Sequence, residues 1–163
     1  MRSEVAREKE LYEPIRQCLE DIFREKFGNC HLETTSTGFS EEIKGILETD
    51  VLLYLSKEGL HPDLMGYVTK DRSKRIIVVE IKKGHPRIKD IYQTKMYAEL
   101  FGAYYVLLIS SEPIPEETRR LLARKPHLCS HSAGFKAITI GQFSVDEGEI
   151  LEDSWLPPLF EFE

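Results

Sequence analysis

The chain has 163 residues and a formal net charge of −6, and 41% of its residues are hydrophobic. This length and composition suit one compact domain around a single core and leave little room for a second independent domain. Because no apolar run reaches the roughly 18 to 20 residues that cross a bilayer, and no signal-like segment follows the charged N-terminus, we expect a soluble, cytoplasmic protein with no membrane partner.

The first expected element is an amphipathic helix over residues 4–27, where apolar side chains recur at helical spacing. Gly28 is expected to end it. Pro14 requires that the helix either begins later than residue 4 or bends, because proline is tolerated best in a first turn.

A loop rich in Thr, Ser and Gly is expected over residues 34–40, and Ser40 with the two following glutamates is typical of a helix start. Apolar residues from position 43 to 54 then continue at helical spacing. Residues 51–55 could instead form a strand, because short apolar runs fit both structures.

A β-hairpin follows, with strands over residues 64–69 and 75–82 and a turn at residues 71–73. Residues 76–79 form a continuous apolar run, which is typical of a central strand buried on both faces. The remaining pattern predicts a helix over 88–101, a strand over 104–110, a short helix over 115–124 and a last strand over 135–140.

The charges are unevenly distributed along the chain. Residues 70–95 carry nine Lys or Arg and three acids, a local balance of +6, so the rest carries −12. Such a segment could attract a polyanion despite the net acidity, because steering depends on the local field; a solvated charged turn is the alternative.

Residues 146–163 contain seven acids and no Lys or Arg. We expect a single domain over residues 1–145 and an acidic C-terminal tail, docked or flexible, over 146–163.

Two carboxylates are predicted to face each other beyond the hairpin. Residues equidistant from an antiparallel turn are paired, and a turn centred between positions 71 and 72 places Asp63 opposite Glu80. Like charges about 5 Å apart destabilise a sheet unless a positive group lies between them. A hard divalent cation with oxygen ligands is the usual solution.

Lys82 strengthens this prediction because alternate strand residues share a face, which places Glu80 and Lys82 together. Ile81 points into the opposite apolar layer, while its carbonyl could supply a third oxygen to a metal ion. The alternative is structural: Glu80 and Lys82 would form a salt-bridged strand end, and Asp63 would belong to a turn after Pro62.

These residues resemble the PD-(D/E)XK nuclease superfamily, which carries Pro-Asp before a hairpin and Glu-x-Lys after it, here Pro62-Asp63 and Glu80-Ile81-Lys82. The RecB-like branch adds a Gln-x-x-x-Tyr element, matched by Gln93 and Tyr97. Residues four apart lie on one helical face, so both could point toward the site. Alternatively, Tyr97 belongs to the core and Gln93 is solvated.

The resemblance implies a restriction endonuclease-like α/β fold: a central mixed sheet of about four to five strands flanked by helices, with an αβββαβ-type core. It also implies a metal-dependent nuclease that hydrolyses phosphodiester bonds in DNA. In this role Asp63 and Glu80 would hold Mg²⁺ or Mn²⁺, and Lys82 would orient or help deprotonate the attacking water. Gln93 and Tyr97 would brace the DNA or the lysine.

Many members of this superfamily also supply an acid from the first helix. Glu8 is our candidate for a further metal ligand, because it lies on the stripe that faces the core, whereas Glu10 and Glu13 point away. A solvated helix start is the alternative reading. The expected contacts to nucleic acid come from the basic residues after the lysine strand, namely Lys83, His85, Arg87 and Lys89.

A different class of function is also compatible with the sequence. The chain could be a catalytically inactive nuclease-fold module that binds nucleic acid or takes part in protein assembly, including as a homodimer. A metal-binding measurement separates the two classes, because an inactive module has no reason to bind Mn²⁺ at Asp63.

Overall fold

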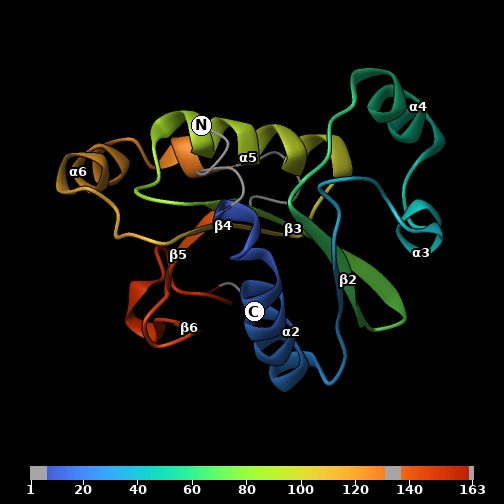
Figure 1. Ribbon diagram of the computed structural model, residues 1–163. Helices are drawn as coiled ribbons and strands as arrows, with labels where there is room; N and C mark the ends of the chain where they lie inside the picture. The colour runs from blue at the N-terminus through green and yellow to red at the C-terminus, as the bar shows by residue number, and fades with distance from the viewer. Residues whose placement is uncertain (1–6, 131–136, 162–163) are drawn as a thin grey trace.

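A six-stranded mixed sheet with helices on both faces forms the centre of the molecule (Figure 1). The computed structural model describes residues 7–130 and 137–161. Along the sheet the strands follow their order in the chain: β1 (His31–Thr34), β2 (Leu64–Lys70), β3 (Ser73–Lys82), β4 (Tyr105–Ser110), β5 (Thr139–Ser144) and β6 (Glu149–Ile150). The helices are α2 (Tyr12–Phe27), α3 (Glu41–Lys44), α4 (Thr49–Glu58), α5 (Ile88–Phe101) and α6 (Glu116–Arg124), with 3-10 turns η1 (Pro126–Cys129) and η2 (Glu152–Ser154).

The expected α/β class with a mixed sheet is confirmed, although the sheet has six strands rather than four to five. β1, β2 and β3 pair antiparallel, β3, β4 and β5 pair parallel, and β6 returns antiparallel to β5. The two additional strands are the edge strands β1 and β6. They have four and two residues, too few to show the period-2 pattern that identifies a strand in a sequence.

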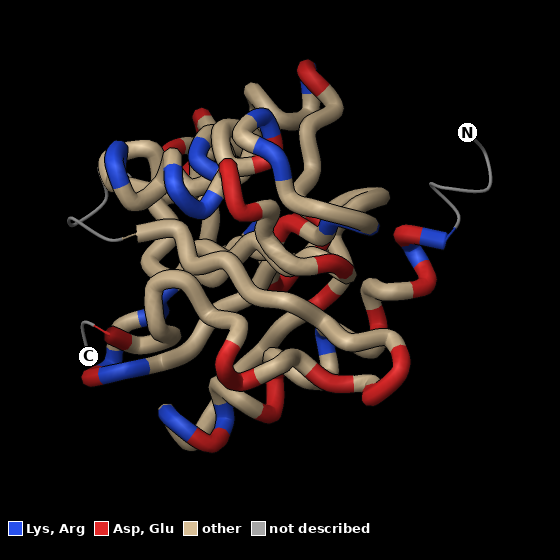
Figure 2. Tube along the Cα trace, turned by 90° about the vertical axis from the view of Figure 1, so that its left-hand side faces the viewer, with Lys and Arg blue, Asp and Glu red and all other residues tan. Residues whose placement is uncertain are grey.

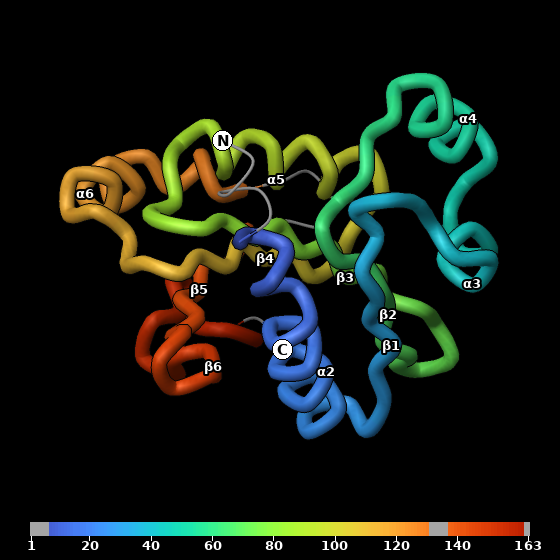
Figure 3. Tube along the Cα trace, in the orientation of Figure 1, coloured from blue at the N-terminus to red at the C-terminus, as the bar shows by residue number. Residues whose placement is uncertain are grey.

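The sheet separates two apolar layers. On one face α2 buries Ile15, Leu19 and Phe23 against alternate residues of the central strands. The other face is covered by α5 together with α6 and parts of α3, α4 and η1. Figure 1 shows α5 and α2 on opposite sides of the strands, and Figure 3 shows β1 beside β2 at the edge that carries α3 and α4. The central strand β3 is thus buried on both faces, as its continuous apolar run predicts.

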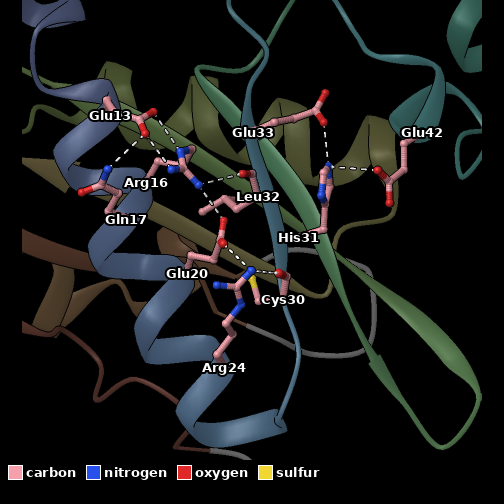
Figure 4. A network of polar contacts seen from close by, with 10 residues as sticks. All are labelled: Glu13, Arg16, Gln17, Glu20, Arg24, Cys30, His31, Leu32, Glu33 and Glu42. Carbon is pink, nitrogen blue, oxygen red and sulfur yellow. Dashed lines mark hydrogen bonds and ion pairs between the residues drawn. The ribbon is translucent and has the colours of Figure 1, made fainter.

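The helix expected over residues 4–27 is interrupted shortly before Pro14. Residues 7–9 are helical, a turn follows at 10–11, and α2 begins at Tyr12, which places Pro14 within its first turn. Gly28 ends α2 in the left-handed conformation. A polar network joins α2 to β1: Arg16 bonds to Glu20 of its own helix at 2.6 Å and reaches the Leu32 carbonyl (Figure 4).

The hairpin has the predicted register. Leu64 pairs with Val79, and the pairing runs to Lys70 with Ser73. Asp71 and Arg72 both have positive φ values, 51° and 67°, the conformation of a type I′ turn whose twist matches the strands. Counted from the turn, this register places Asp63 opposite Glu80, just beyond the last pair of the two strands.

Three expectations from the sequence need correction. The stretch 43–54 is helical, but it is divided between α3 and α4, and a strand over 51–55 is wrong. The strand expected at 135–140 is β5, which begins at Thr139 and extends to Ser144; residues 131–136 lie outside the described part of the chain. Among the described residues, no helix is long and apolar enough to cross a membrane.

The acidic segment after β5 is docked along residues 149–161. β6 pairs with β5, and Leu156 forms an isolated bridge with Ile140. The ring of Phe160 then packs edge-on against Phe23, with centroids 5.2 Å apart. Ile150, Trp155, Leu159 and Phe160 therefore belong to the layer that α2 covers, whereas Leu156 packs against the opposite layer.

Candidate active site

A polar cleft with a volume of about 280 Å³ opens where β3 ends, between the start of β2 and the first turns of α5. It brings together most of the residues that the sequence singled out, and its polar lining consists of Glu8, Asp63, Glu80, Lys82, Lys89, Asp90 and Gln93. Segments from four parts of the chain thus meet at one site.

Asp63 and Glu80 are joined directly at the end of the hairpin. The Asp63 N–H donates to Glu80 Oε1 at 3.1 Å, and the Ile81 N–H donates to Asp63 Oδ2 at 2.8 Å. These backbone-to-side-chain bonds lie just beyond the last ladder pair of β2 and β3, Leu64 with Val79. Both carboxylates line the same cleft.

Tyr12 is a site residue that the helical pattern of residues 4–27 did not identify. Its hydroxyl donates to Asp63 Oδ1 at 2.7 Å, across 51 positions of the chain. The Asp63 carboxylate is therefore held on both oxygens, by α2 on one side and by β3 on the other. The only signal in the sequence was that Tyr12 follows Glu8 by four residues on the same apolar stripe.

Burial makes both carboxylates poor acids. Glu80 is only 8% exposed, and loss of hydration together with the nearby Asp63 raises its pKa to about 9. Burial also raises the pKa of Asp63, against the lowering effect of the bonds from Ile81 and Tyr12. Tyr12 itself has a raised pKa, chiefly because it is buried and next because it faces Asp63. With both carboxylates ionised, the site would hold more negative charge than its surroundings compensate.

Glu80 and Lys82 project from the face of β3 that α5 covers. Val78 on this face belongs to the α5 layer, whereas Ile77, Val79 and Ile81 belong to the α2 layer, as strand alternation predicts. The Lys82 side chain lines the cleft. Among the described residues its ammonium has no hydrogen-bond or ion-pair partner, so it is available to a bound group.

The two residues of the Gln-x-x-x-Tyr element have different positions. The Gln93 amide donates to Glu80 Oε2 at 3.4 Å, so α5 reaches the site. Tyr97 does not line the cleft: it is buried in the α5 layer, and its hydroxyl donates to the His61 carbonyl at 3.2 Å. Tyr97 thereby supports the segment that leads into Asp63.

Glu8 lies at the cleft, and Glu10 and Glu13 are exposed, as the helical stripe predicts. Its carboxylate does not approach the other two in the manner of a metal ligand but accepts a hydrogen bond from the Lys83 N–H at 3.1 Å. Glu8 thus ties the first helical turn to the end of β3.

The basic residues after β3 do not act as one group. Lys89 lines the cleft, whereas Arg87 is exposed at the start of α5. His85 faces away from the cleft, with Nε2 3.1 Å from Glu112 and Nδ1 2.7 Å from the Pro113 carbonyl. Figure 2 shows Lys and Arg interleaved with Asp and Glu over the visible chain, so no broad region of this view is uniformly basic.

The donor set of the cleft fits a hard divalent cation. Among the residues that the structure describes, no three His, Cys, Asp or Glu side chains converge as a preformed metal site. Magnesium does not require three, because it keeps several waters and commonly binds one or two carboxylates together with substrate phosphates. Asp63 and Glu80 provide such a pair, buried and with raised pKa values, and a bound cation would favour their ionised forms.

A larger cleft of about 760 Å³ lies between α2 and the C-terminal segment, but its lining is mainly apolar with an acidic rim of Glu25, Glu152 and Asp153. It brings together neither a general base with a nucleophile nor a cation with carboxylates. The smaller cleft at Asp63 therefore holds the reactive groups.

Comparison with known proteins gives no match: no family model, no curated protein and no solved structure is significantly similar to this chain.

Proposed function

We propose that this chain is a metal-dependent nuclease of the PD-(D/E)XK type, with a restriction endonuclease-like fold of the RecB-like branch, which hydrolyses phosphodiester bonds in DNA. The observation that carries the proposal is that the Asp63 and Glu80 carboxylates line one cleft, joined by the bond from the Asp63 N–H to Glu80, with Lys82 on the same face of β3 as Glu80. Buried carboxylates with raised pKa values are typical of functional sites.

In this proposal Asp63, Glu80 and the Ile81 carbonyl hold Mg²⁺ or Mn²⁺. A cation there would polarise the scissile phosphate and lower the pKa of a water molecule. It would also compensate the charge that raises the pKa of Glu80. Glu8 can join only if it releases the Lys83 N–H, to which it is now bonded.

The chain's own side chains orient and stabilise the reacting groups. Water attacks phosphorus while the bond from phosphorus to the leaving oxygen breaks. The free ammonium of Lys82 orients this water and stabilises the charge on the phosphorane-like transition state. Gln93 holds Glu80, and Tyr12 holds Asp63, so both carboxylates keep their orientation during the reaction.

A nucleic-acid-binding or assembly module without catalysis is the second candidate, and one observation favours it: the described residues contain no ready-made set of three ligating side chains. Calorimetric titration with Mn²⁺ separates the two. The nuclease proposal requires metal binding that Asp63→Ala removes, whereas a module has no reason to bind metal at this position.

The decisive experiment is a digestion panel of labelled single-stranded DNA, double-stranded DNA and RNA, with Mn²⁺ and with a chelator. We expect cleavage only with the metal, and a loss of about 100-fold or more in Lys82→Ala. Lys74→Ala is the matched control: it removes the same side chain from the same face of β3, about 27 Å away. Equal cleavage by the two variants would contradict the assignment.

A further inference from the structure

Three polar residues stand in a row at the carboxyl ends of the parallel strands. Lys82 of β3 pairs with Ser110 of β4, which pairs with Gln142 of β5. Residues in register on neighbouring parallel strands share a face, and this face is the one that α5 covers. The row therefore begins in the candidate active site and runs away from it across the edge of the sheet.

A second polar cleft of about 270 Å³ lies at the far end of this row. Its lining includes Ser110, Gln142, Arg119 of α6, and Asp153 and Ser154 of η2. In open α/β sheets, ligands bind outside the carboxyl ends of the strands. Both clefts have this position.

The wall that η2 provides is held in place by specific contacts. The Ser154 hydroxyl accepts from the Gln142 N–H at 2.9 Å and donates to the Leu151 carbonyl at 2.6 Å. On the other face of the sheet, the Trp155 ring packs on Gly141 so closely that a Cβ there would lie 2.5 Å from it. The C-terminal segment thus forms a fixed side of the cleft.

The donors in this cleft suit a phosphate group. Arg119 is exposed and its guanidinium has no hydrogen-bond or ion-pair partner within the described chain, whereas the neighbouring Arg120 pairs with Glu116 at 3.3 Å. The side-chain amide of Gln142 is likewise unbonded within the described chain. The Ser110 hydroxyl, in contrast, is used structurally, because it donates to the Glu112 carbonyl at 2.7 Å. A guanidinium and an amide present N–H groups that phosphate oxygens accept.

Asp153 on the rim decides which phosphate fits. Its carboxylate repels a free dianion, so a small phosphate gains little there. A phosphodiester carries one charge and, if the same strand is already bound at Lys82, it reaches Arg119 at a high effective concentration. Since neighbouring strands are about 4.8 Å apart, Lys82 and Gln142 are about 10 Å apart, a distance that nearby phosphates of one strand can span.

We infer that the cleft between Arg119 and Gln142 is a second phosphate subsite, which binds a phosphate of the substrate strand close to the scissile bond. This inference rests on the proposed nuclease function. It places the nucleic acid along the carboxyl ends of β3, β4 and β5, with the scissile phosphate at Lys82.

Binding without cleavage tests the subsite. Fluorescence anisotropy in a chelator, with labelled single strands of about 2 and about 12 nucleotides, measures affinity against salt concentration. We expect Arg119→Ala to weaken binding of the longer strand on the order of tenfold and to reduce the salt slope by about 0.7. The shorter strand cannot span the row, so its binding should not change.

Arg120→Ala is the matched control, because it removes the same charge one residue further along α6, away from the cleft, and should change binding less than about twofold. Equal weakening by the two variants would overturn the subsite while leaving the nuclease proposal intact. Failure of the unmodified protein to bind the longer strand would overturn the subsite, whereas metal-dependent cleavage in the digestion panel decides the nuclease proposal separately.

Discussion

Replacing Glu80 by glutamine should stabilise the metal-free protein, and increasingly so as the pH rises. Glu80 is buried, and its pKa is raised to about 9 by burial and by Asp63. In the unfolded chain a glutamate titrates near 4.3. Between pH 4.3 and pH 9 the folded state keeps a proton on Glu80 that the unfolded state has lost. The free energy of unfolding is therefore highest below the unfolded pKa and falls as the pH rises toward 9.

The size of this stability change follows from the difference between the folded and unfolded pKa values of Glu80. Each pKa unit corresponds to about 1.4 kcal/mol, so at pH 7 the carboxyl of Glu80 costs the fold up to about 3 to 4 kcal/mol. Glutamine has the same shape and can keep the bond from the Asp63 N–H without this cost. We expect the advantage of Glu80→Gln over the original chain to grow by up to about 4 kcal/mol between pH 5 and pH 8, or roughly 8 to 16 °C in Tm.

Urea denaturation in a chelator at several pH values, followed by circular dichroism, measures this difference. Glu58→Gln on α4 removes an exposed carboxylate and is the control, with an unchanged pH profile expected. Added Mn²⁺ should stabilise the original chain but not Glu80→Gln, because only the former can bind the ion with both carboxylates. Parallel pH profiles for the original chain and Glu80→Gln would refute the reasoning.

Three further substitutions test the site and its support. Tyr12→Phe keeps the ring in the core but removes the hydrogen-bond donor to Asp63. Calorimetry should show that the affinity for Mn²⁺ falls about tenfold or more. An unchanged affinity would mean that the hydroxyl does not position the carboxylate. Gly66→Ala would place a Cβ 1.8 Å from the His31 carbonyl oxygen. Thermal unfolding should show that the free energy of unfolding falls by about 2 to 3 kcal/mol, because β1 must separate from β2. An unaltered Tm would disprove that contact. Phe160→Ala removes a ring packed on α2 and β4, so denaturation should show a loss of about 2 to 3 kcal/mol; a cost below about 0.5 kcal/mol would indicate that the acidic segment is not docked.

Local patterns were sufficient to predict the central part of the fold. The turn at Asp71 and Arg72 sets the register of the whole hairpin, so the pairing of Leu64 with Val79 follows from counting, and the contact between Asp63 and Glu80 is the next pair. The helix before Gly102 and the apolar strand after it are equally local. Side-chain period and turn chemistry are properties of neighbouring residues, which is why the sequence alone identifies them.

The edge strands and the loop contacts depend on how the helices and strands pack together. Neither of the short edge strands β1 and β6 carries enough residues to show a period, and each forms because an adjacent strand offers unpaired N–H and C=O groups. The turn of His85 toward Glu112 likewise depends on where the loop after β4 lies.

In the candidate site, too, some features follow from local sequence and others from tertiary packing. The sequence by itself determined that two carboxylates and a lysine converge at the end of a hairpin, because hairpin register and strand alternation are local. Only the tertiary structure decided that Tyr12 holds Asp63, that Tyr97 supports the cleft from behind, and that Lys82, Ser110 and Gln142 form one row. These contacts join residues tens of positions apart, and they are set by the order of strands in the sheet and the packing of helices on it, which have no signature in neighbouring residues.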